Sequence, residues 1–247
     1  MKIKLRQLIL CMVLGLTACR TAELHVGEDL KAGTTVLTVK GRQGFQIGQV
    51  LRFGEYSTSK VERGWTNSFR IPFIVSFSGA KEKLSFQQFG PGKQFARVAM
   101  VSKIRSTEVD LFREYFTISG PVRNIFAGGI ELSNTKENWE FWLEAADGAA
   151  LGEGNKTLGY LRSTEDHLQI SVEGIRQLEG RSAKFPTSQV YGYAFRMDGK
   201  LIGAVSIIDA GKVWTRDNIH PEIKLVLASV YSGLLLRNNL QEVVEEL

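Results

Sequence analysis

The sequence predicts a mainly β fold: a single antiparallel β-barrel or curved sheet of about ten strands with a buried hydrophobic C-terminal helix. Three observations lead to this prediction. Residues 168–173 alternate strictly between apolar and polar, which is typical of a strand with one solvent-exposed face. Asp198-Gly199 separates two apolar runs and favours a tight hairpin. From Ile223 to Leu236, ten of fourteen residues are apolar and cover all sides of a helix, so we expect it to be buried.

The strands are indicated in order by short β-branched or alternating runs. Glycine-rich turns such as Gly90-Pro-Gly92 separate several of them. Residues 111–118 fit a helical face and a strand face equally well. Pro221-Glu222 places a proline and a carboxylate in the first turn of the terminal helix, which we expect over about 219–245. The expected strand regions are 34–40, 49–62, 71–77, 84–89, 95–101, 138–144, 158–162, 167–173, 191–197, 201–208 and a short one at 213–214.

The helix can be accommodated in two ways. In the first, strands surround it on all sides; in the alternative, a β-sandwich packs it against one sheet face. The closed arrangement resembles the tubby-like fold shared by tubby, LURP-one-related and phospholipid scramblase proteins. The resemblance rests on residues 193–205, then 212–217, then the helix at 223–236. It implies a barrel wrapped around the helix and a lipid-interacting protein, although no phosphoinositide-binding motif of that group is matched.

The first nineteen residues form a secretion signal. Lys2, Lys4 and Arg6 make a positive head, an apolar centre follows over 8–16, and nine apolar residues are too few to span a bilayer. Leu16-Thr17-Ala18-Cys19 resembles the lipobox of bacterial lipoproteins. The resemblance implies cleavage before Cys19 and diacylglycerol on its sulfur. The alternative is a hydrophobic N-terminal helix of the folded domain.

These features predict three parts of the chain: a lipoprotein signal peptide over 1–18, a lipidated polar tether over 19–33, and one β-rich domain over 34–247. In lipoproteins, an aspartate after the lipidated cysteine favours the inner membrane. Because Arg20 stands there, the resemblance implies the outer membrane of a bacterial cell envelope, facing the periplasm.

The composition is that of a globular protein, with 43% hydrophobic and 23% charged residues, which excludes wholesale disorder. The formal net charge is +5, but three of the 31 basic residues and none of the 26 acidic ones lie in the leader. The mature chain therefore carries 28 minus 26, or +2. We expect no nucleic-acid partner from so small an excess.

The sequence contains little that suggests catalysis. Of two cysteines, Cys11 leaves with the signal and Cys19 is used by lipidation, so no disulfide is expected. His25, His167 and His220 lie far apart without metal-ligand spacing. No Gly-x-Ser-x-Gly elbow occurs. Acid pairs such as Glu165-Asp166 are interpreted as solvated turns. We expect no catalytic residue, no cofactor and no metal.

One aromatic side chain is kept as a candidate ligand surface. In 138–144, Trp139 shares a strand face with Phe141 and Leu143 and is assigned to the core, whereas Trp142 lies on the opposite face. Flat rings of this kind can stack on sugars or peptides.

Three functional hypotheses follow. The first is a non-catalytic, lipid-anchored envelope lipoprotein that binds or scaffolds an envelope protein, lipid or glycan and reaches the membrane through Cys19. The second is a lipid-interacting protein of tubby or scramblase type. The third is a periplasmic glycan hydrolase, which requires two carboxylates about 5 to 10 Å apart in an open cleft.

Overall fold

The computed structural model describes residues 22–43, 47–64, 82–105, 123–135, 137–144, 157–180 and 189–237 of the 247-residue chain. Several sequence-based predictions lie outside these ranges: the leader with Cys19, the strand over 71–77, the ambiguous segment 111–118, and the chain after 237.

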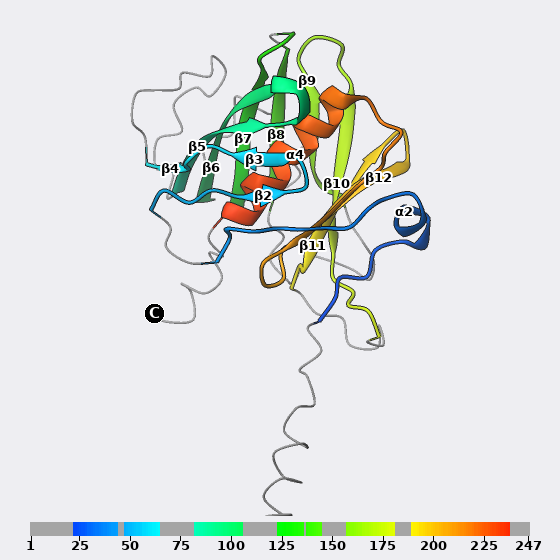
Figure 1. Ribbon diagram of the computed structural model, residues 1–247. Helices are drawn as coiled ribbons and strands as arrows, with labels where there is room; N and C mark the ends of the chain where they lie inside the picture. The colour runs from blue at the N-terminus through cyan, green and yellow to red at the C-terminus, as the bar shows by residue number, and fades with distance from the viewer. Residues whose placement is uncertain are drawn as a thin grey trace, which may run out of the picture.

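One curved antiparallel sheet contains all the strands of the described part (Figure 1). Its strand order is β1-β13-β12-β11-β10-β9-β8-β7-β6-β5-β3-β2, with β4 also paired to β5. The strands are β1 (Leu37–Thr38), β2 (Arg52–Phe53), β3 (Tyr56–Thr58), β4 (Glu62–Arg63), β5 (Glu82–Phe89), β6 (Phe95–Arg105), β7 (Arg123–Leu132), β8 (Asn138–Glu144), β9 (Thr157–Ser163), β10 (Gln169–Ile175), β11 (Gly192–Met197), β12 (Lys200–Ser206) and β13 (Lys212–Thr215).

The two ends of the sheet nearly meet, which makes it barrel-like. β1 pairs with β13 on one side, and two residues further on Lys40 forms a bridge with Arg52 of β2. The Lys40 N–H donates to the Arg52 carbonyl at 2.8 Å, and the Arg52 N–H donates back at 3.0 Å. This bridge occupies backbone groups that an open sheet edge would leave unpaired.

The hairpin expected at Asp198-Gly199 is confirmed. Met197 of β11 lies opposite Lys200 of β12, so the loop has two residues. Both turn residues have positive φ, 51° for Asp198 and 74° for Gly199, as a type I′ turn requires.

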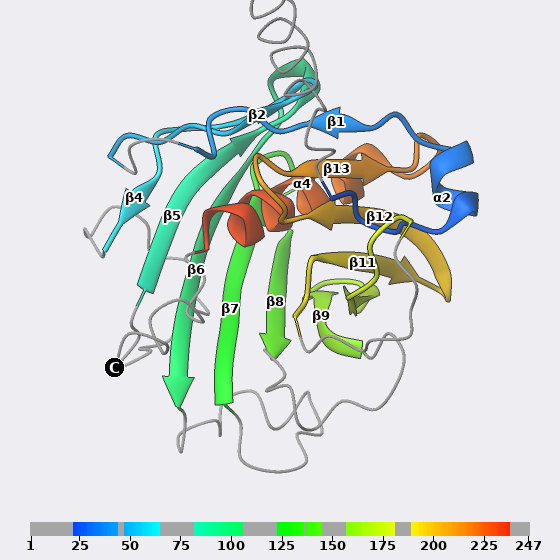
Figure 2. The ribbon, with the colours of Figure 1, turned by 90° about the horizontal axis from the view of Figure 1, so that it is seen from below.

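The helix α4 (Pro221–Leu236) lies inside the curved sheet, and Figure 2 shows strands around it. Thirteen of its sixteen residues are buried, and it packs against β5, β6, β7 and β13. The predicted barrel with an enclosed helix is therefore confirmed, and the β-sandwich alternative is wrong because a single sheet surrounds the helix. In the ranges that the structure covers, no helix combines the length and apolar composition needed to cross a bilayer.

Two short helical segments complete the described elements. The 3-10 helix η1 (Pro91–Lys93) forms the turn between β5 and β6. The helix α2 (Glu28–Ala32) lies outside the barrel, where the sequence indicated only a polar tether.

Candidate functional site

The two site residues proposed from the sequence have different outcomes. Cys19 lies outside the described residues. Trp142 does not belong to the core cluster around α4 that contains Trp139, which agrees with its expected place on the opposite strand face. Its side chain is nevertheless only 4% exposed. Its candidacy as a ligand surface stays a prediction.

The chain before β1 is folded against the barrel. We call residues 22–33 the strap. Leu24 forms a bridge with Leu178, just after β10. The His25 N–H donates to the Gln177 carbonyl at 3.0 Å, and the Glu179 N–H donates to the Glu23 carbonyl at 2.8 Å. Residues 22–33 are therefore packed on the barrel, in the stretch that the polar composition had indicated as a tether.

Apolar side chains hold the strap to the outside of the sheet. Leu24, Val26 and Leu30 are at most 3% exposed. They form a second hydrophobic cluster, separate from the one around α4, with residues of β10 to β13: Ile175, Ala194, Leu201, Ala204 and Trp214. Leu30 projects from α2 into this cluster, and burial of its side chain fixes the helix on the sheet. The other residues of α2 are mostly exposed to solvent.

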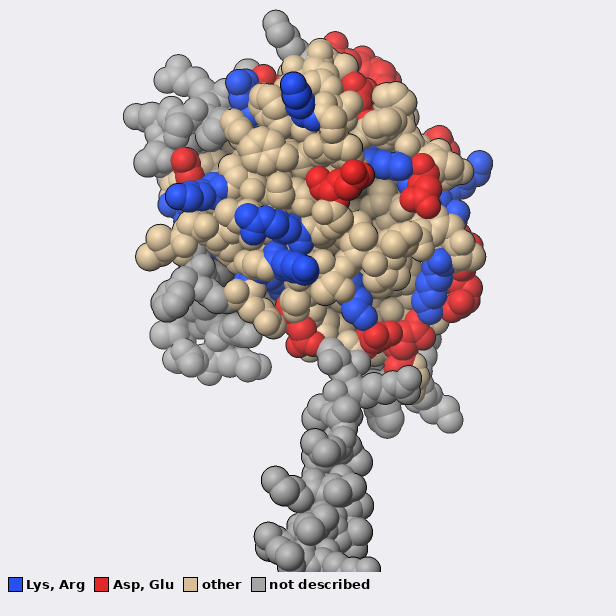
Figure 3. All heavy atoms as spheres, viewed as in Figure 1, with Lys and Arg blue, Asp and Glu red and all other residues tan. Residues whose placement is uncertain are grey.

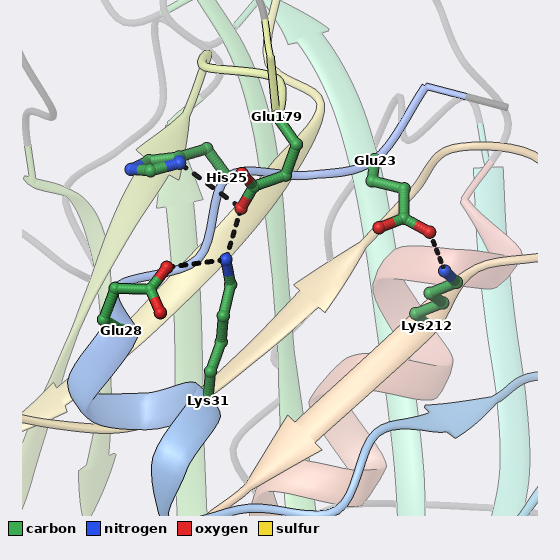
Figure 4. Close-up of polar contacts among 6 residues, drawn as sticks. All are labelled: Glu23, His25, Glu28, Lys31, Glu179 and Lys212. Carbon is green, nitrogen blue, oxygen red and sulfur yellow. Dashed lines mark hydrogen bonds and ion pairs between the residues drawn. The ribbon is translucent and has the colours of Figure 1, made fainter. Parts of the chain in front are cut away.

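Ion pairs surround this apolar contact (Figure 4). Glu179 accepts from Lys31 Nζ at 2.5 Å and lies 3.3 Å from Nδ1 of His25. Lys31 also contacts Glu28 at 2.9 Å. At the start of the strap, Glu23 pairs with Lys212 of β13 at 2.8 Å. A further pair, Asp29 with Arg216 at 2.9 Å, lies on the α2 side.

The contact between Lys31 and Glu179 shifts the pKa values of both side chains. The hydrogen bond from Lys31 is the main reason that the pKa of Glu179 lies below its usual value of 4.5. The same bond is the main reason that the pKa of Lys31 lies above 10.5. The two directions agree, as expected for a bonded pair of opposite charge. Both groups are about one third exposed, so the pair stabilises the strap by no more than about 1 kcal/mol.

Two arginines from loops and strand ends bind the C-terminal carbonyls of α4. Arg42 donates from Nε to the Leu235 carbonyl at 3.0 Å and from Nη1 to the Ile207 and Asp209 carbonyls, each at 2.6 Å. Arg63 donates to the Leu236 carbonyl at 3.0 Å and pairs with Glu82 at 2.6 Å. The last turn of α4 has no basic residue of its own. These guanidinium groups therefore satisfy helix-end carbonyls and neutralise the negative end of the helix dipole.

Several of these features share one end of the barrel, which we call the Arg42 end. Here α4 finishes, the β12–β13 turn contacts Arg42, and the strap begins beside Lys212, the first residue of β13. The opposite end carries the N-terminus of α4 and the turns after β5, β7, β9 and β11.

The histidines and acid pairs take structural positions. His167 has a φ of 59° in the β9–β10 turn, where its Nδ1 lies 3.2 Å from Arg162. Asp166 in the same turn accepts from the Leu168 N–H, which is the main cause of its lowered pKa. His220 precedes α4. Within the described ranges, no three His, Cys, Asp or Glu side chains group closely enough to hold a metal ion.

One carboxylate on the outer face of the sheet has a raised pKa. Glu140 of β8 lies opposite Arg162 of β9, and burial raises its pKa above 4.5 while the arginine opposes that shift. Figure 3 shows basic and acidic side chains interspersed on the face that it presents.

The strap, Arg42 and Arg63 were not found by sequence reasoning. The only local signal for the strap is the spacing of Leu24, Val26 and Leu30 between polar residues. No protein-family model matches the chain, and no curated protein and no solved structure matches it at a significant level.

Proposed function

We propose that this protein is a non-catalytic cell-envelope lipoprotein, anchored by a lipidated Cys19 and acting by binding or scaffolding. The lipobox Leu16-Thr17-Ala18-Cys19 supports the anchor. Two or more acyl chains hold a protein durably on a bilayer, at about 0.8 kcal/mol for each buried methylene. Arg20 supports the outer membrane as the location.

The observation that carries this proposal is the folded strap. Glu23 is already bonded to the barrel, through its carbonyl and through Lys212. The lipobox therefore ends only four residues before the folded domain. That arrangement suits a signal peptide that is removed at Cys19, and it agrees less well with a leader that forms part of the domain core.

The test uses the two cysteines as a matched pair. Cells that express the wild-type chain, Cys19→Ser or Cys11→Ala are grown with a radiolabelled fatty acid. We expect label on the wild type and on Cys11→Ala, because Cys11 lies in the discarded leader, and none on Cys19→Ser. Label that survives in Cys19→Ser overturns the proposal. Fractionation of Arg20→Asp tests the location, since the lipoprotein rule expects this variant to move to the inner membrane.

The enclosed helix favours a second candidate, a lipid-interacting protein of tubby or scramblase type. That resemblance implies a barrel around a hydrophobic helix, and α4 has such surroundings. The two candidates differ in what the protein does to lipid. In vesicles containing a fluorescent phospholipid, the second candidate predicts faster exchange of the lipid between leaflets, and the first predicts exchange equal to that of protein-free vesicles.

A further inference from the structure

We propose that the Arg42 end of the barrel rests against the bilayer that holds Cys19. This inference depends on the anchor proposed above and adds an orientation and an interaction surface to it. The partner is a phospholipid bilayer, contacted through its headgroup region.

The number of residues between Cys19 and the strap limits how far the barrel can lie from the membrane. Three residues lie between Cys19 and Glu23, so their Cα atoms are four residue steps apart. A fully extended chain covers at most about 3.6 Å per residue, so the Cα atom of Glu23 lies within about 14 Å of the Cα atom of Cys19. A loose tether over 19–33 would instead allow roughly 50 Å by the same rule. The folded strap therefore keeps the barrel close to the membrane.

The position of the strap determines which face is close. Glu23 and Leu24 are fixed beside Lys212 and Leu178, which both lie at the Arg42 end. The strap then runs away from that end towards α2, where Leu30 is fully buried. A chain that enters here brings the Arg42 end to the lipid surface and leaves the β7–β8 turn at residues 133–135 on the far side.

An exposed apolar side chain lies on the same end. Ile47 is 93% exposed, the highest value among the large hydrophobic residues of the described part. It belongs to the loop between Lys40 and Arg52 that also carries Arg42. Gln49 braces this loop by donating to the Gly41 and Arg42 carbonyls at 3.1 and 2.8 Å. The exposed Ile47 side chain is of a kind that a bilayer interface would accept.

Three cations at this end already have partners within the protein. Glu23 is paired with Lys212, and Arg63 with Glu82. Arg42 donates hydrogen bonds to three backbone carbonyls. We therefore expect these three cations to contribute little to binding of anionic headgroups.

Single-cysteine reporters test the orientation, because lipidation blocks the sulfur of Cys19. The full lipidated protein is placed in phosphatidylcholine vesicles that contain a nitroxide-labelled lipid as quencher. A fluorophore is attached at Gln43→Cys at the Arg42 end, with Ile47 intact, or at Asn134→Cys at the far end. Both positions are exposed. We expect loss of most fluorescence at residue 43 and no loss at residue 134.

A longer tether provides the matched control. Twenty Gly and Ser residues inserted after Arg20 leave the strap and barrel unchanged but free the domain from the short connection. Quenching at residue 43 should then fall towards the value at residue 134. Equal quenching at both positions in the parent protein overturns the proposed orientation. Unchanged quenching at 43 after the insertion overturns the claim that the short connection holds the Arg42 end at the bilayer. A protein that does not bind vesicles and carries no lipid contradicts the anchor itself.

Discussion

The hydroxyl of Tyr231 in α4 occupies the space where a Cβ at Gly203 of β12 would lie. This hydroxyl donates a hydrogen bond to the Trp214 carbonyl of β13 at 3.1 Å. Burial raises the pKa of the Tyr231 phenol, so it stays protonated and able to donate. Helix and barrel wall therefore meet at a point where the strand must have no side chain.

Gly203→Ala should destabilise the protein by about 1–3 kcal/mol, because the added methyl meets the Tyr231 oxygen. The cost should shrink in a Tyr231→Phe background, where that oxygen is gone. Urea unfolding of the wild type, both single variants and the double variant measures the coupling. Equal costs of Gly203→Ala in the two backgrounds would contradict the contact.

A second link between helix and wall is polar and fully buried. Ser232 donates to Oε1 of Gln88 at 2.6 Å, and both residues are 0% exposed. Ser232→Ala removes the donor for this oxygen and should cost about 1–3 kcal/mol. Ser229→Ala is the control on the same helix. Ser229 donates to the Leu225 carbonyl of its own helix, so its loss should change the unfolding free energy little.

Removal of the arginines at the end of α4 should destabilise the barrel. Arg42→Met leaves the Leu235, Ile207 and Asp209 carbonyls without this donor, and we expect a cost of about 1–3 kcal/mol in thermal or urea unfolding. Arg52→Met is the matched control, since the Arg52 side chain is exposed on β2. A cost for Arg42→Met no larger than that of the control would show that the helix end does not need the guanidinium.

The strap should loosen in acid. The pKa of Glu179 in the folded protein lies below 4.5, so its contribution is complete above about pH 4.5 and is lost as the pH falls through the lowered value. The raised pKa of Lys31 works in the other direction, and that contribution is lost as the pH rises beyond 10.5 through the folded value. We expect strap docking to be strongest between these limits.

Hydrogen exchange at the His25 and Glu179 amides, corrected for intrinsic rates, measures this docking. Protection should be lower at pH 3 than at pH 7. Glu179→Gln should lower protection at pH 7 by an amount equivalent to at most about 1 kcal/mol and flatten the acid response. Glu28→Gln is the control, because Glu28 is 83% exposed. If protection in Glu179→Gln still falls between pH 7 and pH 3 as in the wild type, the acid effect comes from another group.

The sequence predicted the parts of the fold that depend on local patterns. The alternation over 168–173 indicated β10, Asp198-Gly199 indicated the β11–β12 hairpin, and the apolar surface of 223–236 indicated an enclosed helix. β7 (Arg123–Leu132) lies in a stretch where no strand was expected, and β4, with two residues, is too short to show an alternation, so the strand count was underestimated.

The contacts of the candidate site were not predictable because they join distant segments. Leu24 and Leu30 pack on the outer faces of β11 to β13, more than 150 residues away, and Arg42 reaches Leu235 across 193 residues. Periodicity shows which residues share a face, but it does not show what covers that face. For the same reason Trp142, correctly placed on the outward side of β8, proved to be buried.

The most direct test of the account is the mass of the N-terminal peptide of the protein purified from cell membranes. We predict a peptide that begins at Cys19, continues Arg20-Thr21, and carries a glycerol group with fatty acyl chains. A peptide that begins at Met1, or one that carries an unmodified Cys19 thiol, would contradict the lipid anchor and the membrane orientation that depends on it.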